Sequence, residues 1–175
     1  MVVVVNNQFY QSGILCGSYL LDPKAVSFKN KKDYFISIGD QAKLLKIKTK
    51  VNTNTLEGAI ILKYFDEELL SFEEWDLLDQ LWCYLIDMVE GYLKEGQAET
   101  YFPDQPIRIS FKKLPGKQLL FTKEGKEKSK WVLPEQLFLS VLLTAGFTFF
   151  EEIMAVFPVN YGIEKKQIEV LLETF

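Results

Sequence analysis

Seven carboxylates and no basic residue lie between Tyr64 and Trp82, in the stretch YFDEELLSFEEWDLLDQLW. Carboxylates can ligate a hard cation, act as a general acid and base, or offer a negative surface to a basic protein. Like charges at this density repel one another, which lowers stability. The run therefore needs an explanation, either in local structure or in a partner.

Metal binding and cofactor chemistry find little support in the residue types. A calcium loop needs alternating oxygen ligands around a central glycine, whereas Leu69, Leu70 and Phe72 interrupt this run. The chain has no histidine, so histidine-dependent catalytic triads and Cys/His zinc sites are excluded. None of the ten glycines forms a GxGxxG or GxxxxGK[ST] phosphate loop. We expect a non-catalytic protein with no cofactor and no metal.

One catalytic alternative stays open. Pro103-Asp104 followed by Glu124-x-Lys126 resembles, in order and spacing, the PD-(D/E)xK nuclease signature. In that family the two acids hold magnesium and the lysine activates water. Here the Glu and Lys flank Gly125 in a turn, whereas the family places them on an apolar strand. The alternative is thus a magnesium-dependent nuclease.

Part of the acidic run has a local explanation. Ser71-x-x-Glu74 is a capping box, which predicts a helix beginning at Phe72 and ending at Gly96. Acids in the first turn complement the helix dipole by about 0.3–1 kcal/mol each. This accounts for Glu73, Glu74 and Asp76, but not for Asp66, Glu67 and Glu68, which precede the cap.

The remaining acids indicate a recognition surface. At 100° per residue, Asp76 and Asp79 fall on the face of the helix opposite its apolar side, and Phe72 lies among the acids as a candidate interface anchor. We predict that a basic protein partner binds this surface, and a merely solvated acidic face is the alternative. The predicted partner-binding residues are Asp66, Glu67, Glu68, Phe72, Glu73, Asp76 and Asp79.

Charge is divided into blocks along the chain. Residues 56–107 carry two lysines against thirteen acids, and 108–131 carry eight bases against two acids. The basic block surrounds a predicted hairpin, where lysines commonly protect a sheet edge. Because the sequence pI is about 5.0, we expect no nucleic-acid partner.

Apolar periodicity predicts one α+β domain over residues 1–175: a mostly antiparallel sheet of about five to seven strands, covered by two helices. One is the amphipathic helix 72–95, and the other is the buried helix 134–157. A final helix is expected over 164–174. The expected strands are the N-terminal valine run, 33–39, 43–50, the central strand 58–65, the hairpin 106–114 and 117–124, and 130–133.

Polar positions in the buried helix raise a smaller question. Ser140, Thr144 and Thr148 recur at every fourth residue. Their hydroxyls either bond to the helix backbone or form the rim of a groove.

Location follows from what the chain lacks. The start MVVVVNNQF resembles neither a secretory signal nor a transit peptide, and the apolar runs 1–21 and 136–150 are interrupted or too short to span a bilayer. We expect a cytoplasmic protein with no membrane partner, in which Cys16 and Cys83 are reduced packing residues. The valine run is a candidate self-pairing edge, so a monomer or weak homo-oligomer is expected.

Three segments carry a resemblance to known proteins: GAIILKYFDEELLSFEEWDLLDQLWCYLIDMVEGYL, FPDQPIRISF and LPEQLFLSVLLTAGFTFFEEI. Their layout over residues 58–153 is similar to small immunity-type proteins of bacterial polymorphic toxin systems. The resemblance implies a cytosolic inhibitor that binds and blocks a cognate toxin, often a basic nuclease. A structural interaction module without inhibitory action is the further alternative.

Overall fold

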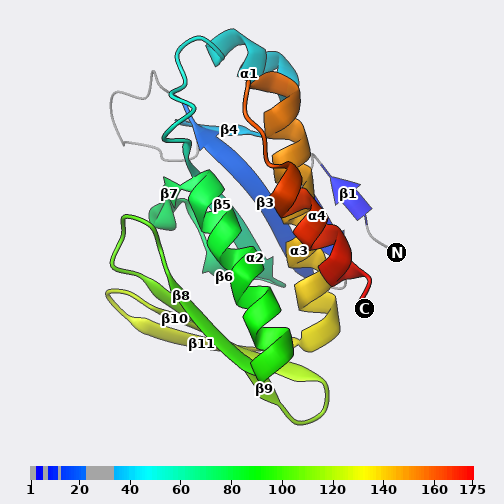
Figure 1. Cartoon of the computed structure of the whole chain (residues 1–175). Helices are drawn as coiled ribbons and strands as arrows, with labels where there is room; N and C mark the ends of the chain where they lie inside the picture. The colour runs from blue at the N-terminus through cyan, green and yellow to red at the C-terminus, as the bar shows by residue number, and fades with distance from the viewer. Residues whose placement is uncertain (1–2, 6–7, 12, 23–33) are drawn as a thin grey trace.

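Two antiparallel sheets and four α-helices make up the computed structural model, which describes residues 3–5, 8–11, 13–22 and 34–175 (Figure 1). The α+β class is therefore confirmed. The larger sheet has seven strands and runs in the order β1-β2-β3-β5-β6, with β4 also paired to β3 and β7 to β5. Its strands are β1 (Val3–Val5), β2 (Gln8–Gln11), β3 (Ile14–Leu21), β4 (Phe35–Ser37), β5 (Glu57–Tyr64), β6 (Glu67–Leu70) and β7 (Asp76–Leu77).

The predicted hairpin does not join that sheet but builds a second one. Its four strands lie in the order β11-β10-β9-β8. They are β8 (Gln97–Tyr101), β9 (Arg108–Leu114), β10 (Gln118–Glu124) and β11 (Lys128–Pro134). Gly116 and Lys117 both have positive φ, which closes the predicted turn between β9 and β10.

Helices α2 (Leu78–Glu95) and α3 (Glu135–Val156) pack between the sheets and share one core with both. Helix α4 (Gly162–Leu172) lies against α2 and α3, and α1 (Gln41–Ile47) contacts α3. On the second sheet, Phe111 meets Tyr92 of α2 and Phe138 of α3 edge to face, with ring centroids 6.1 and 5.4 Å apart. The buried character predicted for the helix 134–157 is confirmed.

Strand β5 is central, as its apolar pattern predicts. It pairs with β3 on one side and with β6 and β7 on the other. Its residues alternate between two cores: Ile60 and Leu62 join the main one, whereas Ala59 and Ile61 join a smaller cluster on the opposite face. Burial of both faces explains why the strand carries no polar alternation.

Helices α2 and α3 approach closely at Gly146. A Cβ placed there would lie 3.0 Å from the Trp82 ring. That ring stacks on Phe149 and donates its indole N–H to Ser18 Oγ of β3 at 3.0 Å. The glycine therefore lets one buried tryptophan connect both helices to the larger sheet.

The strand expected over 43–50 is wrong. These residues belong mostly to α1, in which Leu44 and Ile47 are buried one turn apart. Asp40 accepts the N–H of Lys43 and caps the helix. The alternation of apolar residues with lysine resembled a strand, but the i, i+3 pair and the capping acid favoured the helix.

Helix α3 has the length and hydropathy of a membrane span, and 56% of its most apolar window is buried inside the fold. That burial is typical of the core helix of a soluble domain. Its Ser140 hydroxyl donates to the carbonyl of Leu137, and Thr144 donates to that of Ser140. The first two members of the polar stripe are therefore backbone-bonded.

Candidate protein-recognition surface

The acidic run is divided between the two ends of β5. Glu67 pairs with Tyr64 at one end, and Asp76 pairs with Gly58 at the other. At about 3.3 Å per residue, these two pairs lie about 20 Å apart along the strand. The seven predicted residues therefore do not form one continuous surface.

The first group occupies the turn from Phe65 to Glu68, which we call the acidic turn. Asp66, Glu67 and Glu68 are all exposed. Glu68 pairs with Lys63 at 2.6 Å, whereas no ion pair holds Asp66 or Glu67 among the residues that the structure describes. Two adjacent carboxylates are thus free to meet a base from outside.

Phe65 is the residue that sequence reasoning missed. Its side chain is 62% exposed and its φ is 51°, a conformation that costs a non-glycine residue about 1–2 kcal/mol. The Phe65 amide donates to the Gly13 carbonyl at 2.5 Å, and its ring lies edge to face on Tyr64. A strained backbone therefore presents an apolar ring to solvent beside three acids. The position of Phe65 in the sequence could have identified it, because it directly precedes the acids at a hairpin turn.

Phe72, in contrast, does not anchor an exposed surface. Its ring centroid lies 4.7 Å from that of Phe35 and 5.1 Å from that of Tyr19. These rings belong to the smaller hydrophobic cluster, on the face of the larger sheet opposite the main core. This contradicts the expectation that it lies among acids on a solvated helix face. It is a packing residue.

The capping box forms, but it does not begin the long helix. Ser71 Oγ accepts the N–H of Glu73, and Glu74 accepts that of Ser71. This closes only a 3-10 turn, Phe72–Glu74, because Trp75 is extended and Asp76–Leu77 pair with β5. Helix α2 begins at Leu78, six residues later than predicted, and ends as expected at Gly96. Pairing of Asp76–Leu77 with β5 therefore prevents the helix from beginning at the capping box.

Asp76 is buried, contrary to its predicted place on the helix surface. It is 3% exposed. Its carboxylate accepts the backbone N–H groups of Leu77, Asp104 and Gln105 at 2.7 to 3.2 Å. The side chain therefore fixes the loop between β8 and β9, and it is not available to a partner.

The predicted acidic face of α2 is partly covered by α4 and by Tyr161, which precedes it. Asp79 Oδ2 accepts the Tyr161 hydroxyl at 2.7 Å, and Gln167 donates to both Asp87 and Glu90. Burial raises the pKa of Tyr161, and the hydrogen bond to Asp79 adds to the shift. Asp79 thus has a structural role, in place of the solvated one predicted.

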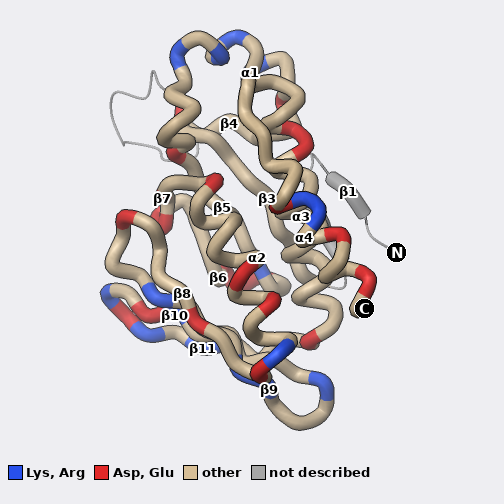
Figure 2. Tube along the Cα trace, in the orientation of Figure 1, with Lys and Arg blue, Asp and Glu red and all other residues tan. Residues whose placement is uncertain are grey.

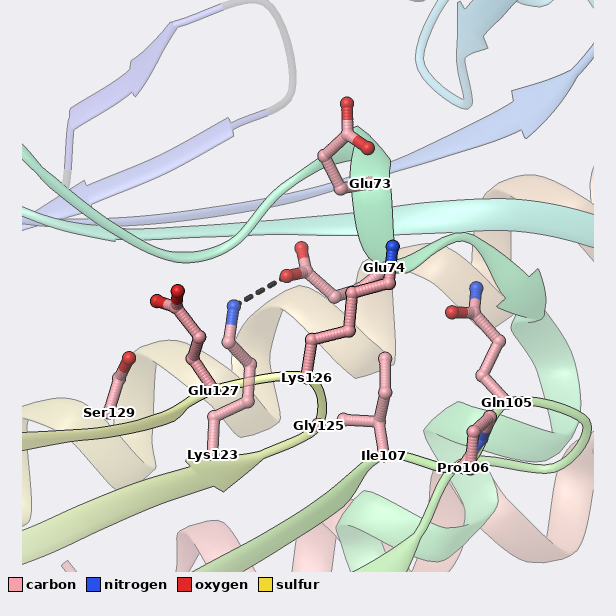
Figure 3. A pocket seen from close by; sticks show the side chains of 10 residues that line it. All are labelled: Glu73, Glu74, Gln105, Pro106, Ile107, Lys123, Gly125, Lys126, Glu127 and Ser129. Atoms are coloured by element: carbon pink, nitrogen blue, oxygen red, sulfur yellow. Dashed lines mark hydrogen bonds and ion pairs between the residues drawn. The ribbon is translucent and has the colours of Figure 1, made fainter.

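Glu73 and Glu74 lie at the junction of the two sheets. A pocket of about 690 Å³ lies there (Figure 3). A second pocket, of about 350 Å³, shares Glu73 and Gln105 with it. In the first pocket the Glu74 carboxylate is already paired with Lys123. In the second, Asp76 is held by backbone N–H groups. The charges buried in these pockets are therefore satisfied from within the domain.

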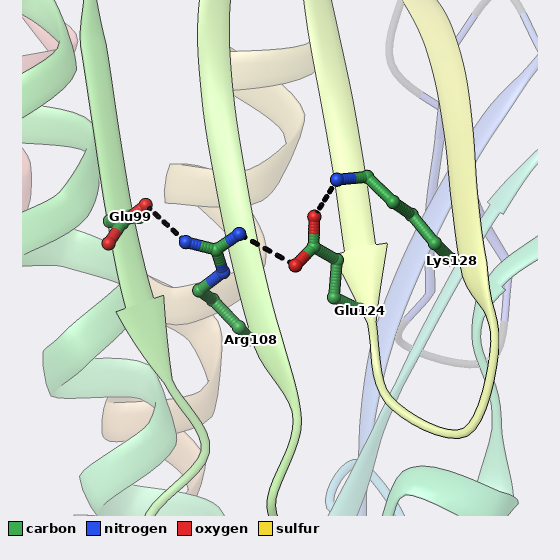
Figure 4. Close-up of polar contacts among 4 residues, drawn as sticks. All are labelled: Glu99, Arg108, Glu124 and Lys128. Carbon is green, nitrogen blue, oxygen red and sulfur yellow. Dashed lines mark hydrogen bonds and ion pairs between the residues drawn. The ribbon is translucent and has the colours of Figure 1, made fainter.

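The residues of the nuclease alternative are not assembled into a site. Glu124 uses both carboxylate oxygens on Arg108 and Lys128 (Figure 4). Asp104 lies on the β8–β9 loop and Lys126 extends toward the 3-10 turn (Figure 3). Within the described ranges, no three Asp, Glu, His or Cys side chains gather closely enough to hold a metal ion.

Cys16 lies in the main core and Cys83 packs against it. Burial raises the pKa of Cys16 and of Cys83 to about 12, and nearby carboxylates contribute at Cys83. Neither forms a disulfide in the described structure, in agreement with the predicted packing role.

No protein-family model, no curated protein and no solved structure matches this chain.

Proposed function

We propose that this domain is a non-catalytic cytoplasmic protein of the immunity type, which binds a basic toxin or nuclease domain through the acidic turn. The observation that carries the proposal is the pairing of an exposed, strained Phe65 with the unpaired acids Asp66 and Glu67. An aromatic anchor within a charged rim is a common form of protein interface. The carboxylates would steer a basic partner, and the ring would bury against it.

The proposal is narrower than the surface predicted from sequence. Asp76, Asp79 and Phe72 have structural partners, and Glu73 lies at the far end of β5. The acidic turn is therefore the accessible part of the predicted surface in which several of the acids lie together. Its short length suits one protruding contact around which a larger interface forms.

The test uses the product of the gene adjoining this one, since an immunity protein is expected beside its toxin. That product is expressed with and without this protein, and cell growth is measured. Protection by the wild type, and its loss with D66K/E67K combined with F65A, would support the proposal. In vitro, D66K/E67K should slow association by about tenfold or more at low salt, because steering falls steeply when the attracting charges are reversed.

The matched control reverses two exposed acids at other sites, Glu95→Lys and Glu173→Lys. It changes net charge by the same amount but leaves the acidic turn intact. If both double variants weaken association equally, the contact is not at the turn. If binding is indifferent to salt in the wild type, the electrostatic part of the proposal is wrong.

A further inference from the structure

One face of the four-stranded sheet is covered by no described helix. Its strands alternate: Phe111 and Phe121 point toward α2 and α3, so their neighbours point outward. The registers then place Tyr101, Arg108, Glu124 and Lys128 in one row across the four strands. We call the side that carries this row the outer face.

Exposed apolar groups lie on the outer face among bases. Tyr101 is 59% exposed and Val132 is 48% exposed. Lys112 stands opposite Leu120, which stands opposite Val132 in the next strand. Lysine and arginine also mark the hairpins of this sheet when charge is mapped on the chain (Figure 2). The outer face therefore combines a small apolar patch, Leu120 and Val132, with positive charge, although the whole chain carries a net charge of −4.

An ion-pair row fixes one margin of the outer face. Arg108 binds Glu99 at 3.0 Å and Glu124 at 2.6 Å, and Lys128 binds the second oxygen of Glu124 (Figure 4). The acids of this row are thus committed to bases in the same sheet. Lys112 and Lys130 have no ion pair among the described residues. They are the charges left for an external carboxylate.

The acidic turn has the complementary chemistry. It offers an exposed ring together with Asp66 and Glu67, which lack bases. No hydrogen bond or ion pair links the turn to the outer face within the described part of the chain. Two complementary surfaces on one molecule that do not meet within it can meet between copies, as a heterologous contact.

We infer that a second copy of this chain docks its acidic turn on the outer face. Phe65 packs on Val132 and its cross-strand neighbour Leu120, and Asp66 and Glu67 meet Lys112 and Lys130. The contact is small and mostly electrostatic, so self-association is weak and sensitive to salt. This inference rests on the same turn as the proposed function but requires no toxin. Self-association would then compete with partner binding.

The experiment is sedimentation velocity of the full chain over a range of concentrations at low and high salt. The weight-average sedimentation coefficient should rise with concentration at low salt and lose most of that rise at high salt. K112E/K130E and D66K/E67K should each weaken self-association by about tenfold or more, since two attractive pairs become repulsive. E95K/E173K serves as the charge-matched control and should associate as the wild type does.

Mixing D66K/E67K with K112E/K130E gives the decisive test. The basic turn of D66K/E67K matches the acidic face of K112E/K130E, and the unaltered turn and face of the two variants also match. An equimolar mixture should therefore associate where neither variant does alone. A wild type that stays monomeric at low salt, or a mixture that stays monomeric, would overturn the inference. K112E/K130E leaves the acidic turn unaltered, so if it still protects against the toxin, the proposed function survives loss of self-association.

Discussion

Lys123 of β10 and Glu74 of the 3-10 turn form an ion pair between the two sheets, with Nζ 2.5 Å from Oε1. Both side chains are largely buried, at 18% and 14% exposure. Nearby, Gln105 donates its side-chain amide to the Trp75 carbonyl, and Asp76 binds the backbone of the same loop. The junction between the sheets is thus polar on one side of the molecule, and the shared aromatic core lies on the other.

Removing one partner of this pair should destabilise the fold. Lys123→Met leaves the Glu74 carboxylate buried with only Ser71 as a donor, so we expect a loss of about 1–3 kcal/mol in the free energy of unfolding. The double variant E74Q/K123M should cost less than the sum of the single variants, because no unpaired charge remains. Urea unfolding measures all three. Lys166→Met, at the exposed pair with Glu169, is the control and should change stability by less than about 0.5 kcal/mol.

The same pair should contribute to acid sensitivity. Burial raises the pKa of Glu74, but hydrogen bonds from Lys123 and Ser71 outweigh it and hold the pKa below the ordinary value of 4.5. A depressed carboxyl pKa stabilises the fold above that ordinary value, and this stability is lost as pH falls through the folded pKa. The stability difference between wild type and E74Q should therefore be constant near neutrality and shrink in acid. Unfolding at a series of pH values checks this, and a difference that grows in acid would contradict it.

Asp76 should be among the most sensitive acids in the chain. Asp76→Ala leaves the N–H groups of Leu77, Asp104 and Gln105 without their acceptor, so we expect a loss of about 2–4 kcal/mol. Asp76→Asn keeps one acceptor oxygen and should lie between the wild type and the alanine variant. Thermal denaturation measures both. The exposed Asp66→Asn should leave the melting temperature nearly unchanged, and equal effects at the two positions would refute the assigned burial.

Phe65 should trade stability for recognition. Phe65→Gly relieves the positive φ, so we expect a gain of up to about 1 kcal/mol, offset in part by glycine's greater freedom in the unfolded chain. The same change removes the proposed anchor and should weaken toxin binding. Calorimetry of folding and titration with the toxin separate these effects. A loss of stability together with unchanged binding would assign the ring to packing alone.

Local sequence patterns predicted those elements whose tertiary packing favours the same structure. The hairpin of β9 and β10, the central β5 and the buried α3 each have a periodicity that their packing reinforces. The capping box at Ser71 failed as a helix start although every one of its hydrogen bonds forms. Pairing of Asp76–Leu77 with β5 is a long-range contact, and no pattern within the segment could reveal it.

The candidate site was predictable in part for the same reason. Exposure of Asp66, Glu67 and Glu68 follows from a turn between two strands, so sequence reasoning could single them out. The partners of Asp76 and Asp79 lie 28 and 82 residues away, and only the fold brings them together. Phe65 was overlooked because an aromatic residue at a strand end is usually buried.

Side-chain volume at position 146 is expected to set the stability of the fold. A methyl group at this position would lie 3.0 Å from the Trp82 ring, closer than an ordinary van der Waals contact, and Trp82 joins both helices to the larger sheet. Small increments in side-chain volume at this position would lower stability stepwise, without touching either the acidic turn or the outer face. Such a series would make a set of conditional alleles, in which temperature sets the amount of folded protein in a cell while its recognition chemistry stays the same.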